Sequence, residues 1–288
     1  MSYEFDWVDA FTETPFGGNA CMVVHGAEAL PVEERLALVR ETSLSECAYL
    51  VSSDKADFGA RYYLADREIL MAGHPTIATV VSLILRGLTG GRTEFTLEAG
   101  AGVLPIRVVA EPGRPPLIVM RQPAPVFGRR WEPAAIAALY GLAAGDVLGV
   151  PRTVSTGTAF CVTLVRDHDT LRLARLDAGA LAAMERDFFE PFLVALGGAT
   201  PAGRTFARLL LPPPLPAEDP FTGSATGCMA AYLWAEGLIE TPDFVAEQGH
   251  WLGRPGAARV RVLGPRDAIE GVEVGGRGVV LMQGRLRL

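Results

Sequence analysis

The stretch MAGHPTIATVVSLILRGL at residues 71–88 is the most informative part of the sequence. Gly73 and a proline stand where a helix would begin, and an apolar run then continues to Gly87, a residue type that commonly ends helices. A helix that is apolar on all sides has to be surrounded by other elements. This stretch therefore predicts a buried central helix.

A second stretch, FTGSATGCMAAYLWAEGL at residues 221–238, has the same design. Laying Gly73 on Gly223 is a shift of 223 − 73 = 150 residues. The same shift aligns Thr76 with Thr226, Leu83 with Leu233, Gly87 with Gly237 and Leu88 with Leu238. Apolar helices that end in Gly-Leu are common, so chance is one explanation of the match. An internal duplication explains it better.

Short strand-like runs surround both helices, and one further helix is expected in LPVEERLALVRET at residues 30–42. The Pro-rich residues 111–125 suggest a crossing between domains, and a Gly-turned strand pair at 272–288 could return to the first domain. We expect an N-terminal domain of residues 1–115 plus 277–288 and a C-terminal domain of residues 116–276. The predicted strands lie at 3–11, 19–26, 46–51, 58–64, 93–100, 102–109, 159–165 and 207–211.

Composition excludes several classes of function. The 288 residues carry a net charge of −7, and Lys55 is the only lysine among scattered arginines, which argues against a nucleic-acid partner. The apolar runs are too short to cross a membrane, and the first residues are acidic where a secretory signal would be basic. We expect a cytoplasmic protein. The four cysteines have no C-x-x-C spacing, so neither a disulfide nor a metal site is expected.

The two predicted helix N-termini suggest a binding site for an anion. Backbone N–H groups in a first helical turn are free to bind an external ligand, and the helix dipole favours negative charge there. Glycines at 73 and 223 would let a ligand approach the backbone closely. Two such ends facing one cleft between the domains would hold a small carboxylate from both sides.

Three side chains near these helix ends are candidates for the chemistry, and each has a structural alternative. Glu46 completes an S-x-x-E sequence that could be a capping box, although a strand-like run follows it. Asp219 precedes a proline and could simply form a turn. His74 could cap the helix that follows.

Taken together, these motifs resemble the phenazine biosynthesis PhzF-like isomerases, relatives of diaminopimelate epimerase. The likeness covers nearly the whole chain and lies in VDAFTETPFGGNACMVV, ETSLSECAYLV, AGHPT, EDPFTGSATG and EQGHWLGRPG. It implies an α+β, diaminopimelate epimerase-like fold with two pseudo-symmetric domains, each a curled, mostly antiparallel sheet around a central helix. It also implies a homodimer without metal or organic cofactor. The residues that it implicates are Glu46 as proton carrier and His74, Asp219, Gly73 and Ser224 as groups that orient the substrate.

The expected chemistry is the movement of a proton within a small cyclic carboxylic acid, as in a trans-2,3-dihydro-3-hydroxyanthranilate isomerase. A single carboxyl group can remove a proton and return it to another carbon, most effectively when burial raises its pKa towards neutrality. We assign this role to Glu46. His74 and Asp219 would hold the polar groups of the substrate, and Gly73, Gly223 and Ser224 its carboxylate.

Two other functions remain open. An amino-acid epimerase or racemase of this fold would use a cysteine at each helix entrance, but the sequence has Ala72 and Thr222 there. A non-catalytic binding protein would keep the same site without turnover, and Glu46 at the matching place argues against it. A dinucleotide fingerprint, a phosphate-binding loop and a nucleophile elbow are absent from the sequence. His25, His168 and His250 are expected to be structural or surface residues, and Arg129-Arg130 a solvated loop.

Overall fold

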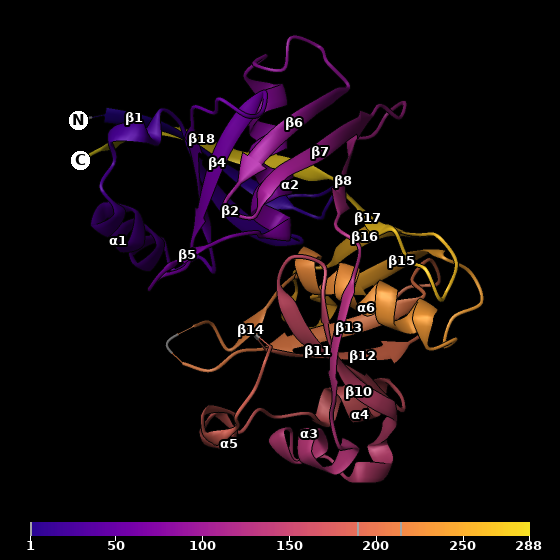
Figure 1. Cartoon of the computed structure of the whole chain (residues 1–288). Coiled ribbons are helices and arrows are strands. Elements are labelled where there is room, and N and C mark those ends of the chain that lie inside the picture. The colour runs from indigo at the N-terminus through magenta and orange to yellow at the C-terminus, as the bar shows by residue number, and fades with distance from the viewer. Residues whose placement is uncertain (1, 189, 214) are drawn as a thin grey trace. The chain divides into compact units, whose positions relative to one another are not determined.

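The computed structural model describes residues 2–188, 190–213 and 215–288 (Figure 1). The chain forms two compact units, Met1–Arg121 with Gly275–Leu288 (unit 1) and Gln122–Val274 (unit 2). The Pro-rich stretch 111–125, interpreted from the sequence as a crossing, contains a full strand, β8 (Leu117–Gln122). Four consecutive apolar residues in the middle of that stretch favour sheet pairing despite the flanking prolines.

Unit 1 is a mixed sheet, and β18 and β1 lie side by side so that both chain ends belong to it (Figure 1). The strand order is β18-β1-β2-β3-β4-β6-β7-β8, with β5 added to β4. The pairs β2–β3 and β4–β6 are parallel and the others are antiparallel. The elements besides β8 are β1 (Ser2–Ala10), β2 (Asn19–Val24), α1 (Val32–Thr42), β3 (Cys47–Val51), β4 (Phe58–Tyr63), β5 (Glu68–Ile69), α2 (Gly73–Leu85), β6 (Glu94–Ala99), β7 (Gly102–Val109) and β18 (Gly278–Arg287).

Unit 2 repeats this plan. Its order is β9-β10-β11-β12-β13-β15-β16, with β14 added to β13 and with β11–β12 and β13–β15 parallel. The elements are β9 (Val126–Arg130), α3 (Pro133–Leu139), β10 (Val147–Ser155), β11 (Ala159–Val165), α4 (His168–Leu173), α5 (Ala178–Ala183), β12 (Pro191–Leu196), β13 (Thr205–Leu210), β14 (Glu218–Asp219), α6 (Gly223–Ala235), β15 (Asp243–Gln248), β16 (Gly256–Leu263) and β17 (Gly271–Gly276).

The same succession of parallel and antiparallel pairs in both units confirms the internal duplication. Strands β2, β3, β4 and β6 of unit 1 correspond to β11, β12, β13 and β15 of unit 2. Each unit also has its two-residue strand directly before the central helix. The expected α+β architecture of two similar units is therefore present.

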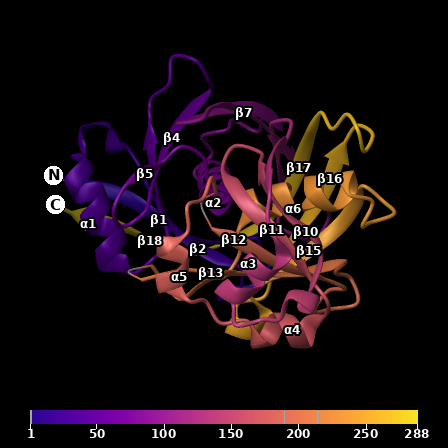
Figure 2. The same cartoon turned by 60° about the horizontal axis from the view of Figure 1, so that its bottom comes forward.

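The central helices α2 and α6 are buried along nearly their whole length, as predicted. In Figure 2, α2 lies among the strands of unit 1, and it contacts β1, β2, β3 and β18. Both helices end in the same way. Gly87 and Gly237 have φ of 68° and 70°, and the next leucine donates its N–H to the carbonyl of Leu83 or Leu233, at 2.9 and 2.8 Å. The aligned residues thus form the same left-handed helix end twice.

A second apolar layer lies on the outer side of each sheet. In unit 1, α1 covers a cluster that includes Tyr49 and Tyr63. In unit 2, the short helices α3, α4 and α5 cover a cluster that includes Leu193 and Leu210. The sequence did not predict these three helices, because each is only six or seven residues long and shows little periodicity.

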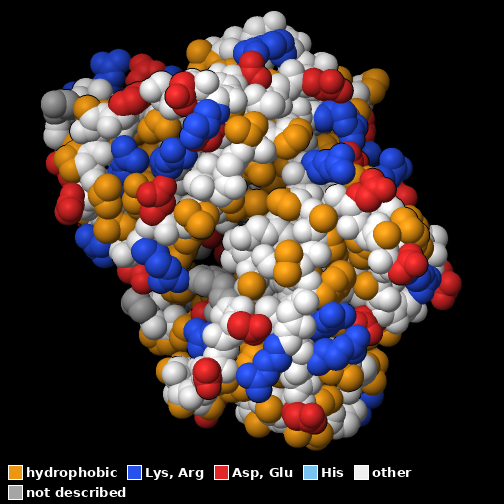
Figure 3. Space-filling model, viewed as in Figure 1, with side chains coloured by type: hydrophobic (Ala, Val, Ile, Leu, Met, Phe, Trp, Pro, Cys, Tyr) orange, Lys and Arg blue, Asp and Glu red, His pale blue; other side chains and the backbone are white. Residues whose placement is uncertain are grey.

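The surface differs from the expectation in one place. Arg129 and Arg130 lie in strand β9 and not in a loop, with Arg129 over the ring of Trp131. On the face shown in Figure 3, Lys and Arg side chains are interspersed with Asp and Glu. Within the described residues, none of the helices combines the length and hydropathy needed to cross a bilayer.

Candidate active site

The N-terminus of α2 carries the first group of candidate residues, all within unit 1. Glu46 lies between the end of α1 and the start of β3, and its side chain is 18% exposed. His74, in the first turn of α2, is 3% exposed. The Nδ1 atom of His74 lies 3.8 Å from Oε2 of Glu46. This separation is too long for a hydrogen bond, so the two groups are neighbours that could act on one ligand.

Asn19 fixes the orientation of His74. Its side-chain amide nitrogen lies 3.1 Å from Nδ1 of the imidazole. Because an amide nitrogen can only donate, Nδ1 accepts, and the neutral ring carries its proton on Nε2. In this arrangement the ring is held as the Nε2–H tautomer. The Nε2–H group is the one that can donate to a substrate.

The start of α2 is held by a threonine. Thr76 donates its hydroxyl to the carbonyl of Ala72 at 2.7 Å and contacts the hydroxyl of Tyr62 at 2.9 Å. In α6, Thr226 donates to the carbonyl of Thr222 at 2.9 Å. This shared hydrogen bond explains why Thr76 and Thr226 align. In the described part of the chain, neither helix has a side-chain cap at its N-terminus. The capping alternative for His74 is therefore wrong.

The N-terminus of α6 carries the second group, within unit 2. Asp219 is 5% exposed, and its Oδ2 accepts a hydrogen bond from the hydroxyl of Thr222 at 2.6 Å. Gln248 holds this turn from β15. Its Nε2 donates to the carbonyl of Asp219 at 2.7 Å, and its Oε1 accepts from the backbone N–H of Thr222 at 3.1 Å. Asp219 therefore has a fixed position beside Gly223 and Ser224, which are both buried.

Gln122 supports the same helix start from β8. Its Nε2 donates to the carbonyl of Gly223 at 3.0 Å, and its Oε1 accepts from the hydroxyl of Thr156 at 2.6 Å. Gly227 makes room for this side chain, because a Cβ there would come within 1.9 Å of the Gln122 Oε1. The glycine of the TGCM sequence thus serves packing and not flexibility.

The structure brings the predicted residues together in two groups: Glu46 with Gly73 and His74, and Asp219 with Gly223 and Ser224. The capping-box alternative for Glu46 is wrong, because Ser43 ends α1 in a left-handed conformation and no helix follows. Sequence reasoning missed the positioning residues Asn19, Gln122 and Gln248. Asn19 could have been noticed because it directly follows the glycines of the GGNA sequence. Gln122 and Gln248 lie in strands far along the chain from the helices that they support, so no local pattern marks them.

The two groups are related by the duplication but differ in chemistry. The strand pair β3–β4 of unit 1 corresponds to β12–β13 of unit 2, and aligning their registers matches Glu46 with Glu190. Aligning the pair β4–β5 with the pair β13–β14 matches Ile69 with Asp219. Glu190 is buried and lies 3.8 Å from the guanidinium of Arg186. The helices place His74 on Ser224. The short strands and the helix starts therefore carry different side chains in the two units, whereas the position of Glu46 holds a glutamate in both.

The fold is the diaminopimelate epimerase-like fold. The family model for phenazine biosynthesis-like proteins matches residues 8–284, and the chain belongs to this family. The chain is 31% identical to the "uncharacterized isomerase YddE" of Salmonella typhimurium, over 95% of both chains. It is 27% identical to the trans-2,3-dihydro-3-hydroxyanthranilate isomerase of Pseudomonas aeruginosa, over 98% of both.

A solved structure has the same architecture throughout. The PhzF-family phenazine biosynthesis protein of Bacillus anthracis matches with a TM-score of 0.88 at 24% identity, and the match covers all of both chains. At this identity the likeness concerns the fold. The named relatives show that the protein is an isomerase.

Proposed function

We propose that this isomerase moves a proton between two carbons of a small cyclic carboxylic acid of the trans-2,3-dihydro-3-hydroxyanthranilate type. The observation that carries the proposal is the Glu46–His74–Asn19 arrangement, a carboxyl group beside a neutral imidazole of fixed tautomer. The relative of Pseudomonas aeruginosa named for this substrate supports the choice of ligand.

Glu46 is the proton carrier in this proposal. Its carboxylate takes a proton from one carbon as that C–H bond breaks, and the resulting carboxylic acid returns the proton to another carbon of the same molecule. The reaction needs no net donor or acceptor, because the substrate and the product are isomers. The Nε2–H group of His74 stabilises the negative charge that develops between the two steps.

The remaining residues hold the substrate. The free N–H groups at the start of α2, at Gly73, and of α6, at Gly223 and Ser224, bind its carboxylate. Asp219 accepts a hydrogen bond from an amino or hydroxyl group of the ring. We propose that both groups of residues bind the same substrate molecule, and that the protein works without a metal or organic cofactor and as a homodimer in the cytoplasm.

The direct test is incubation of the purified protein with trans-2,3-dihydro-3-hydroxyanthranilate, followed by NMR of the products. We expect a rearranged isomer of identical mass. If the compound is returned unchanged while other cyclic amino or hydroxy acids are isomerised, the proton-transfer assignment stands and the substrate assignment is wrong. Asp219→Asn and Ser224→Ala variants should raise KM more than they lower kcat, since they act in binding.

A further inference from the structure

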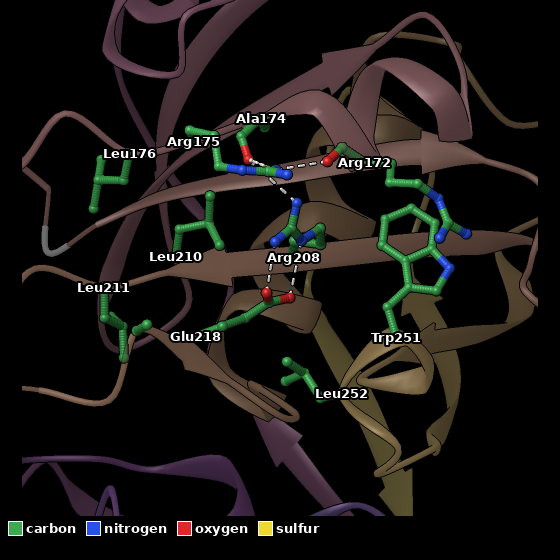
Figure 4. Close-up of a pocket in the computed structure, with 11 residues that line it drawn as sticks. Arg172, Ala174, Arg175, Leu176, Arg208, Leu210, Leu211, Glu218, Trp251 and Leu252 are labelled. Atoms are coloured by element: carbon green, nitrogen blue, oxygen red, sulfur yellow. Dashed lines mark hydrogen bonds and ion pairs between the residues drawn. The ribbon is translucent and has the colours of Figure 1, made fainter.

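Unit 2 contains a pocket on the outer side of β13, separate from the groups at the start of α6. Its cavity of about 620 Å³ is within the usual size range of small-molecule sites (Figure 4). Leu210, which belongs to the outer apolar cluster, forms part of its wall. The side chains used below are Arg172, Arg175, Arg208, Leu210, Glu218 and Trp251.

The pocket has an excess of positive charge. Arg208 is neutralised by Glu218 through two hydrogen bonds of 3.0 and 2.7 Å. Arg175 donates from Nη1 to the carbonyls of Arg172 and Ala174, both at 2.8 Å. Among the residues that the structure describes, no carboxylate pairs with Arg172 or Arg175. The guanidinium of Arg175 is therefore available to an anion, and Arg172 adds positive charge beside Trp251.

One wall of the pocket is a fixed aromatic ring. Trp251 packs edge-on against Phe206, with ring centroids 4.6 Å apart, and the guanidinium of Arg172 lies 4.2 Å from the indole centroid. Figure 4 shows Arg172 beside this ring, and Leu176, Leu211 and Leu252 at the rim. The site thus combines a rigid apolar wall with cationic groups.

The internal duplication allows the pocket beside Leu210 to be compared with the equivalent position in unit 1. The pairing registers place Arg61 on Arg208, Glu68 on Glu218 and Tyr63 on Leu210. In unit 1 the Tyr63 ring fills the space, with its hydroxyl 3.1 Å from Glu68.

In unit 1 a buried arginine completes the arrangement. The Nη1 atom of Arg35 lies 3.4 Å from the Tyr63 hydroxyl, and its guanidinium carbon lies 5.5 Å from the ring centroid of Tyr63. In unit 2 the shorter Leu210 replaces the ring, and Arg172 and Arg175 line a hollow. An aromatic ring with an oxygen acceptor is therefore the group that this position accommodates in the other half of the same chain.

We propose that this pocket binds a small carboxylate carried on a planar apolar ring. The ring lies against Leu210 and Trp251, and the carboxylate pairs with Arg175. The site is independent of the proposed active site, because none of its residues belongs to the groups at the starts of α2 and α6.

Benzoate is a suitable probe, and ligand-observed NMR titration of the full chain measures its binding. We expect saturable binding of benzoate, weaker binding of cyclohexanecarboxylate, and none of benzamide, which lacks the charge. Arg175→Met should weaken benzoate binding about tenfold, since a charge-assisted hydrogen bond is lost. Arg129→Met is the control, an exposed arginine of unit 2 outside this pocket, 4.0 Å from the Trp131 ring centroid. It should leave binding unchanged.

Leu210→Tyr is a second test variant. It places at position 210 the tyrosine that unit 1 has at the aligned position 63, so the new ring should fill the pocket and abolish benzoate binding. Thermal unfolding of Leu210→Tyr shows whether this variant keeps the fold. If it does not, the Arg175→Met variant, which changes an exposed residue, tests the proposal by itself.

Equal benzoate affinity in Arg175→Met and wild type would overturn the proposal. So would loss of binding in Ser224→Ala alone, since benzoate would then occupy the start of α6. Equal affinity for cyclohexanecarboxylate would overturn the assignment of a planar ring, and binding of benzamide that of a carboxylate.

Discussion

At the scale of single residues, the starts of α2 and α6 carry different side chains. Unit 1 supplies a carboxyl group and an imidazole, and unit 2 supplies a carboxylate tied to Thr222 and a serine. The sequence identified these side chains because each stands next to a glycine, a proline or a strand start. It did not identify Asn19, whose role depends on a contact 55 residues away in sequence.

We expect Glu46→Gln to lower kcat by at least about a thousandfold, the upper range for loss of an acid–base group, with little change in substrate affinity. Glutamine keeps the shape of the side chain but cannot carry a proton. Steady-state kinetics and calorimetric binding to the same variant measure the two quantities. A normal kcat would contradict the role of Glu46. Glu41→Gln, on an exposed helix position nearby, is the control.

We expect Asn19→Ala to lower kcat about ten- to a hundredfold, because His74 loses the donor that fixes its tautomer. The ¹⁵N chemical shifts of His74 give a readout that a purely structural effect would not move. In the wild type they should show a proton on Nε2, and in the variant a mixture of tautomers. An unchanged Nε2–H population in the variant would refute the positioning role of Asn19.

At the scale of elements, the central helices depend on close packing at their ends. A Cβ at Gly227 would collide with Gln122, which is buried and holds the carbonyl of Gly223. The two helix ends were predictable because glycine has a local signature. The supporting strands β15 and β16 were not predicted, although β16 alternates buried and exposed residues and contacts α6 directly.

Gly227→Ala should lower the free energy of unfolding by about 1–3 kcal/mol, the usual cost of overpacking, and should also weaken substrate binding. Urea unfolding measures the first effect. Gly145→Ala is the matched control, because no atom lies within 4 Å of a Cβ there. A Gly227→Ala variant as stable as Gly145→Ala would show that Gln122 moves aside freely.

The other end of α2 is joined to β1 and β18 by a buried ionic network. Asp6 accepts hydrogen bonds from Ser82, Arg86 and Gln283, and His25 lies 3.0 Å from it. Of the two expected roles, structural or surface, His25 therefore has the structural one. Burial would raise the pKa of Asp6, yet the hydrogen bonds from Arg86, Ser82 and Gln283 outweigh this and hold that pKa well below 3.8. Burial also lowers the pKa of His25, and the charge of Arg86 lowers it further.

Both shifts predict loss of stability in acid. The unfolded chain takes up protons at ordinary values, near 6.5 for His25 and 3.8 for Asp6, before the folded chain does. The free energy of unfolding should therefore fall as the pH drops below about 6.5, and more steeply below about 4. Asp6→Asn should be about 3–5 kcal/mol less stable at neutral pH, with a shallower decline below pH 4. Urea midpoints across this range test it, with the exposed Asp66→Asn as control. Parallel declines in wild type and Asp6→Asn would contradict the role of Asp6.

At the scale of the whole molecule, the sequence predicted the architecture better than the elements of unit 2. The repeat at a shift of 150 residues and the return of the C-terminal strand to β1 both came from local patterns. Much of unit 2 was missed because its strands are short and its outer helices are brief. The pocket beside Trp251 could not be predicted, since it depends on a leucine replacing a tyrosine at an aligned position.

Removal of residues 278–288 should prevent unit 1 from folding. This segment is β18, which pairs with β1 along its length and contacts α2. The truncated chain would expose the β1 edge and part of the α2 surface, so we expect aggregation or loss of the cooperative thermal transition. A chain lacking only Leu288 should unfold like the wild type. Retention of a normal transition by the longer truncation would contradict this.

The most direct test of proton transfer by Glu46 is single-turnover conversion of trans-2,3-dihydro-3-hydroxyanthranilate in deuterated water, followed by NMR and mass spectrometry. Wild-type protein should give a rearranged isomer with deuterium at the carbon that receives the proton, or with partial retention of hydrogen if the carboxyl exchanges slowly. Glu46→Gln should give neither rearrangement nor deuterium in the recovered substrate. Rearrangement by Glu46→Gln at the wild-type rate would contradict the mechanism.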